Sequence, residues 1–131
     1  MNNQKTIKKE VSCFGKGLHT GLNSSLIFKP APINSGIIFE RIDKNNKKIR
    51  VKMNNVKDLD RGTSLSNQTI SVYSVEHVLS AIYSLDIDNL IISIDNSEVP
   101  IFDGSALIFY NLLKKAQVIE QNAYQDEFIV N

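Results

Sequence analysis

The residues of this chain best suited to chemistry are a glutamate and a histidine that follow one another, in the stretch Ser74-Val75-Glu76-His77. A carboxylate can act as a general base, and a neutral imidazole can bind a metal ion. Both side chains would project from the first turn of a predicted helix, whose positive end favours an ionised carboxylate and an uncharged imidazole. The pair could therefore serve metal-assisted hydrolysis. A solvated surface histidine beside a glutamate that merely suits the helix dipole is the alternative.

A metal site needs more ligands than this pair supplies. Catalytic zinc takes about three protein ligands and keeps one position for water. The chain has two histidines, His19 and His77, and its single cysteine, Cys13, excludes a cysteine cluster. His19 lies in the glycine-rich turn Gly15 to Gly21, where it either fills the turn or belongs to the site. Because Ala81 stands four residues after His77, the His-Glu-x-x-His helix of metalloproteases is excluded. We expect any remaining ligands to come from another piece of protein.

Two helices are predicted from the spacing of apolar residues. The first runs from Val75 to about Leu85, with Ser74 as its N-cap, and follows the i, i+3, i+4, i+7 pattern of an amphipathic helix. His77 falls on its polar side, so we expect it to lie outside the core. The second helix runs from Ser105 to Ala116 and is apolar nearly all round, which predicts that it is sandwiched between other elements.

Strands are predicted mainly before the first helix. They are Lys5 to Phe14, Ser24 to Lys29, Gly36 to Ile42, Ile49 to Met53, Gly62 to Leu65 and Ile70 to Tyr73, and later Asn89 to Asp95 and the extended stretch Glu127 to Val130. Strands followed by helices indicate an α+β fold, a two-layer sandwich with two helices packed on one face of a mostly antiparallel sheet. Within its strand, Cys13 would be a small buried hydrophobic side chain.

The composition fits one globular domain and excludes several classes of function. The chain has 131 residues, of which 42% are apolar and 22% charged. A net charge of +1 argues against binding to nucleic acid or an anionic membrane through bulk charge. No secretory signal or stretch of membrane-spanning length is present, and a lone cysteine suits a reducing compartment, so we expect the cytoplasm. The basic residues between Lys44 and Lys52 indicate a solvent-exposed hairpin, with a phosphate-bearing ligand as the alternative.

Several motifs in a fixed order connect the chain to a known family. They are Gly15-Lys16-Gly17-Leu18-His19-Thr20-Gly21, Lys29-Pro30-Ala31-Pro32, Gly36-Ile37-Ile38-Phe39, Arg61-Gly62-Thr63-Ser64-Leu65, Ser74-Val75-Glu76-His77, Leu85-Asp86-Ile87-Asp88-Asn89 and Glu98-Val99-Pro100-Ile101-Phe102-Asp103-Gly104-Ser105-Ala106. With them the chain resembles the N-terminal half of the zinc-dependent UDP-3-O-acyl-N-acetylglucosamine deacetylases of lipid A biosynthesis. Enzymes of that family have two similar α+β domains with the active site in the cleft between them.

The resemblance implies specific roles. Glu76 would be the general base that activates water, and His77 the one zinc ligand from the first domain. The substrate would be a UDP-linked, acylated glucosamine that loses its N-acetyl group as acetate, and we expect His19 and Thr63 to contact it. The family's other two zinc ligands, a histidine and an aspartate on a helix of the second domain, have no counterpart here.

The resemblance also predicts how the chain is organised. Residues 1–126 would form the N-terminal deacetylase domain, and residues 127–131 would begin a linker or the second domain. That second domain would be supplied in cis or in trans, and without it the chain would be inactive. Two alternatives stay open: a degenerate homologue that keeps the fold as a non-catalytic interaction module, and a ligand-binding α+β domain with a fortuitous match. A downstream coding sequence for a His-x-x-x-Asp helix would favour the enzyme.

Overall fold

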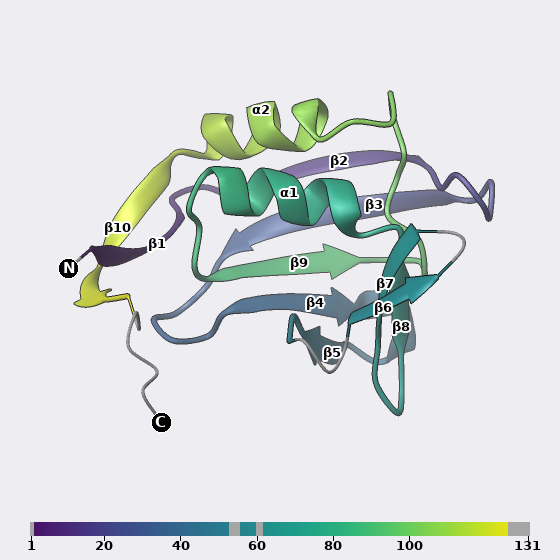
Figure 1. The fold of residues 1–131 in the computed structure, drawn as a ribbon, viewed down its shortest axis with the longest axis horizontal. Helices are drawn as coiled ribbons and strands as arrows, with labels where there is room; N and C mark the ends of the chain where they lie inside the picture. Colours follow the sequence, from purple (N-terminus) through teal and green to yellow (C-terminus); the bar gives the residue numbers. More distant parts are fainter. Residues whose placement is uncertain (1, 53–55, 60–61, 126–131) are drawn as a thin grey trace.

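The computed structural model describes residues 2–52, 56–59 and 62–125 (Figure 1). Within them, a five-stranded sheet has the order β2-β3-β9-β4-β5. Its strands are β2 (Val11–Lys16), β3 (Asn23–Pro30), β4 (Ile37–Arg41), β5 (Lys47–Arg50) and β9 (Leu90–Ile94). Neighbours in this sheet are antiparallel except for β4 and β9, which run parallel.

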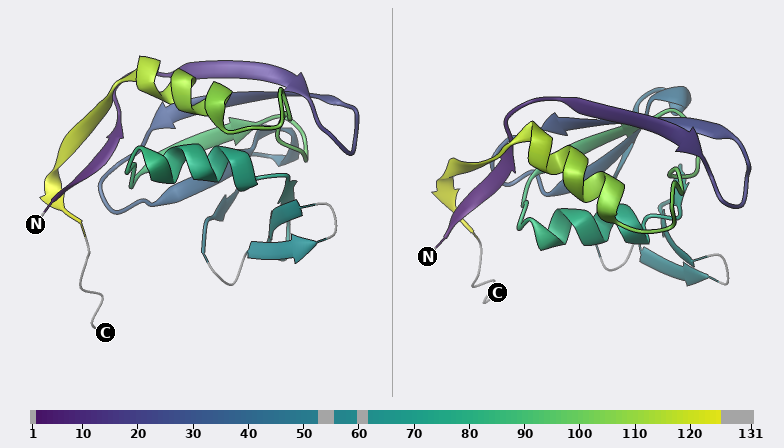
Figure 2. Two further views of the ribbon diagram at one scale, coloured as in Figure 1. Left: turned by 45° about the horizontal axis from the view of Figure 1, so that its top comes forward. Right: turned by 90° about the horizontal axis from the view of Figure 1, so that it is seen from above.

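Helices α1 (Glu76–Ser84) and α2 (Leu107–Ala116) lie side by side on one face of this sheet (Figure 2). The apolar side of α1 is buried, as its spacing predicts, through Val78, Leu79, Ala81 and Ile82. From α2, Phe109 packs edge-on against Phe28 of β3, with ring centroids 6.5 Å apart. The predicted α+β sandwich, with two helices on one face of a mostly antiparallel sheet, is confirmed.

Smaller sheets lie at the two ends of the molecule (Figure 1). At one end, β1 (Asn3–Ile7) pairs with β10 (Val118–Tyr124). At the other, where α1 begins, β6 (Val56–Leu59), β7 (Gly62–Ser66) and β8 (Ser71–Tyr73) form a three-stranded antiparallel sheet. A 3-10 turn, Ile42–Lys44, connects β4 to the turn before β5. None of the described helices has the length and apolar character needed to cross a membrane.

Two sequence predictions about strands need correction. The segment from Lys5 to Phe14 is divided into β1 and β2, because the backbone N–H groups of Lys8 and Lys9 donate to carbonyls at the end of α2 and turn the chain between sheets. The strands β6 and β10 were not predicted; β10 has no fully buried residue, and its apolar signal is weak. The predicted stretch Glu127 to Val130, and Met53, lie outside the described residues.

Two predictions about helices also need correction. Ser74 is not the N-cap of α1, because its backbone has a left-handed φ of 62° and its hydroxyl donates to Glu98. Helix α2 is not sandwiched: Leu107 is 56% and Ile108 is 37% exposed, so one side of the helix faces outward. The buried side of α2 consists of Phe109, Leu113 and Ala116.

Candidate active site

The predicted pair Glu76 and His77 occupies the first turn of α1, and both residues are half-buried. One carboxylate oxygen of Glu76, Oε1, is buried and accepts no hydrogen bond from the described part of the chain. Most buried polar atoms in proteins have a partner, so such an exception calls for a catalytic, ionic or water-mediated explanation. A carboxylate oxygen without a hydrogen-bond partner among the described residues suits a base that must accept a proton.

The chain leading into α1 is held by backbone hydrogen bonds. Tyr73 donates its N–H to the carbonyl of Ser97 (2.7 Å), and its carbonyl accepts the N–H of Val99 (3.1 Å). Val75 donates to the carbonyl of Thr63 in β7 (3.1 Å). The residues on both sides of Ser74 are therefore attached to neighbouring strands and loops, which fixes the direction in which α1 begins.

The two predicted substrate-contacting residues lie near this start through their backbones. Thr63 accepts the hydrogen bond from Val75. His19 donates its N–H to both carboxylate oxygens of Glu98, at 3.1 and 3.2 Å, and that carboxylate also accepts the hydroxyl of Ser74 at 2.6 Å. The structure thus brings His19 and Thr63 to the residues that precede Glu76. Their contact with a substrate stays a prediction.

Glu98 is the functional candidate that sequence reasoning missed. It is 1% exposed, and its carboxylate accepts hydrogen bonds from the backbone of His19 and Thr20 and from Ser74. Burial raises the pKa of the Glu98 carboxyl, but these hydrogen bonds together outweigh burial and hold the pKa below its usual value. The available signal was a single acidic residue directly before the apolar run Val99 to Phe102.

The segment Asp103-Gly104-Ser105 forms a turn before α2, whose N-cap is Ala106. Asp103 Oδ1 accepts the N–H and the hydroxyl of Ser105, at 3.0 and 2.8 Å, and Ser105 Oγ accepts the N–H of Leu107 at 3.2 Å. Hydrogen bonds from Ser105 lower the pKa of the exposed Asp103 carboxyl, and His77 contributes a smaller electrostatic part.

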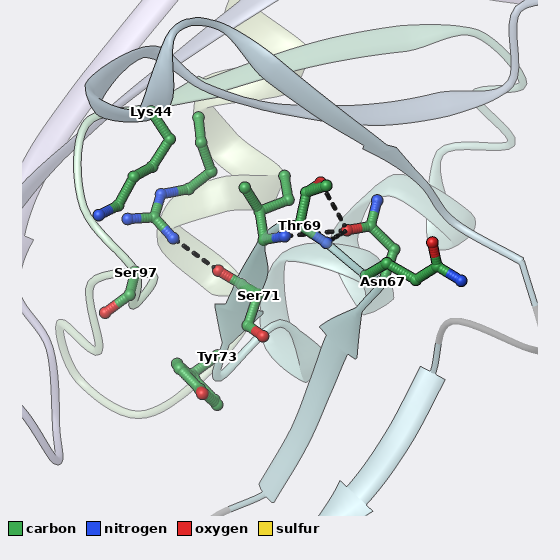
Figure 3. Close-up of a pocket in the computed structure, with 9 residues that line it drawn as sticks. Lys44, Asn67, Thr69, Ser71, Tyr73 and Ser97 are labelled. Atoms are coloured by element: carbon green, nitrogen blue, oxygen red, sulfur yellow. Dashed lines mark hydrogen bonds between the residues drawn. The ribbon is translucent and has the colours of Figure 1, made fainter.

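The predicted basic segment forms a solvent-exposed hairpin, with β4 and β5 antiparallel. Beside it lies an open polar pocket of about 490 Å³ (Figure 3). Its lining includes Lys44, Asn67 and Thr69, and Arg41, whose guanidinium is held by Asp43 at 2.6 and 2.8 Å. Neither Glu76 nor His77 lines this pocket, which is therefore distinct from the candidate site.

The residues present can supply part of a metal site. His77 offers a half-buried imidazole, and the preceding Glu76 has a carboxylate oxygen without a hydrogen-bond partner among the described residues. Among residues 2–52, 56–59 and 62–125, no three His, Cys, Asp or Glu side chains gather as metal ligands. Cys13 is partly buried against the core, and burial raises the pKa of its thiol to about 11, so it is a packed thiol, as predicted.

Comparison with known proteins agrees with the sequence motifs. A family model described as "LpxC: UDP-3-O-acyl N-acetylglycosamine deacetylase" matches residues 4–131. A protein of Saccharophagus degradans named UDP-3-O-acyl-N-acetylglucosamine deacetylase is 45% identical over 124 residues, which is 94% of this chain and 41% of that protein. A protein of the same name from Ruthia magnifica is 38% identical over 130 residues, covering 99% of this chain and 43% of the relative.

A longer relative shows the same partial match. The protein named Bifunctional enzyme LpxC/FabZ from Bacteroides thetaiotaomicron is 41% identical over 131 residues, covering 99% of this chain and 28% of that protein. The chain thus spans between 28% and 43% of the length of these three relatives. Since the family model matches nearly every residue, this chain belongs to the UDP-3-O-acyl N-acetylglycosamine deacetylase family.

Proposed function

We propose that this chain is the N-terminal half of a zinc-dependent amidohydrolase that removes the N-acetyl group from a UDP-linked, 3-O-acylated N-acetylglucosamine, releasing acetate. Family membership and the names of the relatives support the substrate and the reaction. The observation that carries the proposal is the buried Oε1 of Glu76, which has no hydrogen-bond partner among the described residues. Glu76 directly precedes His77 in the first turn of α1. A drifting, non-catalytic homologue would have no reason to keep a buried carboxylate oxygen without a hydrogen-bond partner among the described residues.

Each of the two residues has a defined task. Glu76 accepts a proton from the attacking water on its carboxylate and can later pass it to the departing amine. His77 holds the metal through an imidazole nitrogen. Zinc, when bound, polarises the acetyl carbonyl and lowers the pKa of water. Because catalytic zinc takes about three protein ligands, the other ligands in this proposal come from protein outside residues 1–131.

The proposal also assigns the chain its place in a larger assembly. Residues 1–126 are the first of two domains, and residues 127–131 lead toward the second, which completes the site in cis or in trans. His19 and Thr63 contact the substrate from the first domain. The partial coverage of the relatives supports this division.

The test uses a complete protein that carries this chain and a second deacetylase domain, assayed for acetate release and for bound zinc. We expect Glu76→Ala to lower kcat by roughly 10²- to 10⁴-fold, the usual contribution of a general base, with zinc still bound. We expect His77→Ala to lower both turnover and zinc affinity. Removing a group that only orients a metal ligand lowers metal affinity by about 10- to 100-fold, and the loss for His77→Ala should be larger.

Glu10→Ala is the matched control, because Glu10 is an exposed glutamate between β1 and β2. It should leave turnover and zinc content unchanged. Full activity in both Glu76→Ala and His77→Ala would refute the assigned roles. An inactive, zinc-free native protein would favour the non-catalytic interaction module.

A further inference from the structure

We infer that Glu98 is a positioning residue, whose buried carboxylate attaches the His19 loop to the start of α1 and thereby orients Glu76 and His77. The expected effect of this positioning on catalysis rests on the proposed function. Its structural part can be tested without catalysis.

The carboxylate of Glu98 accepts hydrogen bonds from two separate parts of the chain. From the loop between β2 and β3, Thr20 donates its N–H to Oε1 at 2.8 Å, and His19 donates its N–H to both oxygens. From the segment that leads into α1, Ser74 donates its hydroxyl hydrogen to Oε2 of Glu98 at 2.6 Å. We call these four residues, His19, Thr20, Ser74 and Glu98, the Glu98 clamp. A charged acceptor makes hydrogen bonds about twice as strong as a neutral one, so the clamp is suited to holding two segments at a fixed separation.

The backbone around Glu98 reinforces this connection. The residues on either side of Glu98 pair with Tyr73, as described above, and Glu98 itself forms a parallel bridge with Tyr73. Further along, Ile101 donates its N–H to the carbonyl of Lys16 at 2.9 Å. The segment from Ser97 to Ile101 therefore lies between the end of β2 and the start of α1 and is bonded to both.

The loop conformation shows that it is built around this carboxylate. A Cβ atom at Gly17 would overlap Oε1 of Glu98. Gly17 also donates to the carbonyl of Leu22 at 3.0 Å and accepts from Gly21 at 3.1 Å, which closes the loop. The absence of a side chain at Gly17 thus permits the close approach of the loop to Glu98.

The left-handed backbone of Ser74 connects the Glu98 clamp to the start of α1, where Glu76 and His77 lie. A non-glycine residue at a φ of 62° is held in a costly conformation by its surroundings. The hydroxyl bond to Glu98 is one of the contacts that hold it, and Glu76 follows two residues later. Without this bond only the backbone hydrogen bonds of Tyr73 and Val75 would hold the start of α1, which would then be held less tightly. A shift of about 1 Å at catalytic groups can lower the rate on the order of 100-fold.

Ser74→Ala and Ser24→Ala form a matched pair for the test. Both remove a buried hydroxyl that donates to Glu98: Ser74 to the carboxylate at 2.6 Å and Ser24 to the backbone carbonyl at 2.7 Å. Both should lower the melting temperature to a similar extent. Only Ser74→Ala releases the carboxylate from α1.

The first readout is NMR of the 131-residue chain. We expect Ser74→Ala to shift the resonances of the Glu76 carboxyl carbon and the His77 ring, while the amides of His19 and Thr20 keep their protection from exchange. Glu98→Gln should weaken that protection as well, because an amide presents one acceptor oxygen where the carboxylate presents two. Unchanged Glu76 and His77 resonances in both variants, or equal shifts in Ser24→Ala, would overturn the inference.

The second readout is kinetics of the complete protein. We expect Ser74→Ala to lower kcat by about 10- to 100-fold with little change in KM, and Ser24→Ala to leave both near their native values. Native kcat in Ser74→Ala would also overturn the inference. If the native complete protein released no acetate while the NMR shifts occurred as expected, the proposed function would fail and the positioning of Glu76 and His77 by Glu98 would stand.

Discussion

Replacing Gly17 with alanine tests whether the loop is built around the Glu98 carboxylate. The new Cβ would overlap Oε1 of Glu98 and lie 2.8 Å from both its Cδ and the Thr20 hydroxyl oxygen. Because van der Waals contact needs about 3.5 Å, the loop or the carboxylate would have to move by roughly 1 Å. Such a move would break hydrogen bonds that are 2.6 to 3.2 Å long.

The expected cost follows from these contacts. Overpacking in a tight site costs about 1–3 kcal/mol, and a hydrogen bond to a charged group is worth about 1.5–3 kcal/mol. Allowing for relaxation, we expect Gly17→Ala to lower the free energy of unfolding by about 3 kcal/mol, measured by urea denaturation with the m-value unchanged. The backbone of Gly17 is not left-handed, so the cost is steric and not conformational.

Gly21→Ala is the control, because Gly21 has a φ of 66° and no neighbouring atom lies within 4 Å of the place that an added methyl group would take. It should cost only the left-handed backbone, about 1–2 kcal/mol. In a Glu98→Ala background the overlap with the carboxylate disappears and only the close contact with the Thr20 hydroxyl remains, so Gly17→Ala should then cost well under the about 3 kcal/mol expected in the native chain. Equal costs for Gly17→Ala with and without the Glu98 side chain would refute the reasoning, as would a smaller cost than that of Gly21→Ala.

Three further predictions concern the core and the residues packed against it. Phe109→Ala should lower the free energy of unfolding by about 3–5 kcal/mol, because Phe109 is 1% exposed and packs against Phe28 and Phe102. Leu107 is 56% exposed, so Leu107→Ala should lower it by well under about 1 kcal/mol. Equal melting temperatures for the two variants would contradict this packing. Burial raises the pKa of Cys13 from 9.0 to about 11, so iodoacetamide at about pH 8 should alkylate the native chain far more slowly than the urea-unfolded chain. The same shift contributes stability that is present below pH 9.0 and is lost as the pH rises toward about 11, and a Cys13→Ala variant should lack this loss.

Local patterns predicted the elements that bury a regular apolar face. The spacing from Val75 to Leu85 identified α1, and Val78, Leu79 and Ile82 of that pattern are buried. It also placed Glu76 and His77 together on the first turn. Their roles required the family resemblance, because a glutamate beside a histidine on a helix is chemically unspecific in the sequence.

Features set by long-range contacts could not be read from local patterns. Serine is a residue type that favours the N-cap position, but the Ser74 hydroxyl donates its hydrogen bond to Glu98, which is 24 positions away in the sequence. Lys8 and Lys9 interrupt an apparent strand because they reach carbonyls of Ala116 and Gln117 at the end of α2. Glu98 received no role because only the fold brings the His19 loop and Ser74 to its side.

The most direct test of the account measures acetate release from a UDP-linked, 3-O-acylated N-acetylglucosamine, with zinc present, by this chain alone and after addition of a separately folded second deacetylase domain. The account predicts no turnover by the chain alone and zinc-dependent release after the addition, which Glu76→Ala should lower by roughly 10²- to 10⁴-fold. Brisk zinc-dependent release by the chain alone, or none with a well-folded second domain bound to it, would contradict the claim that these residues supply one part of a shared active site.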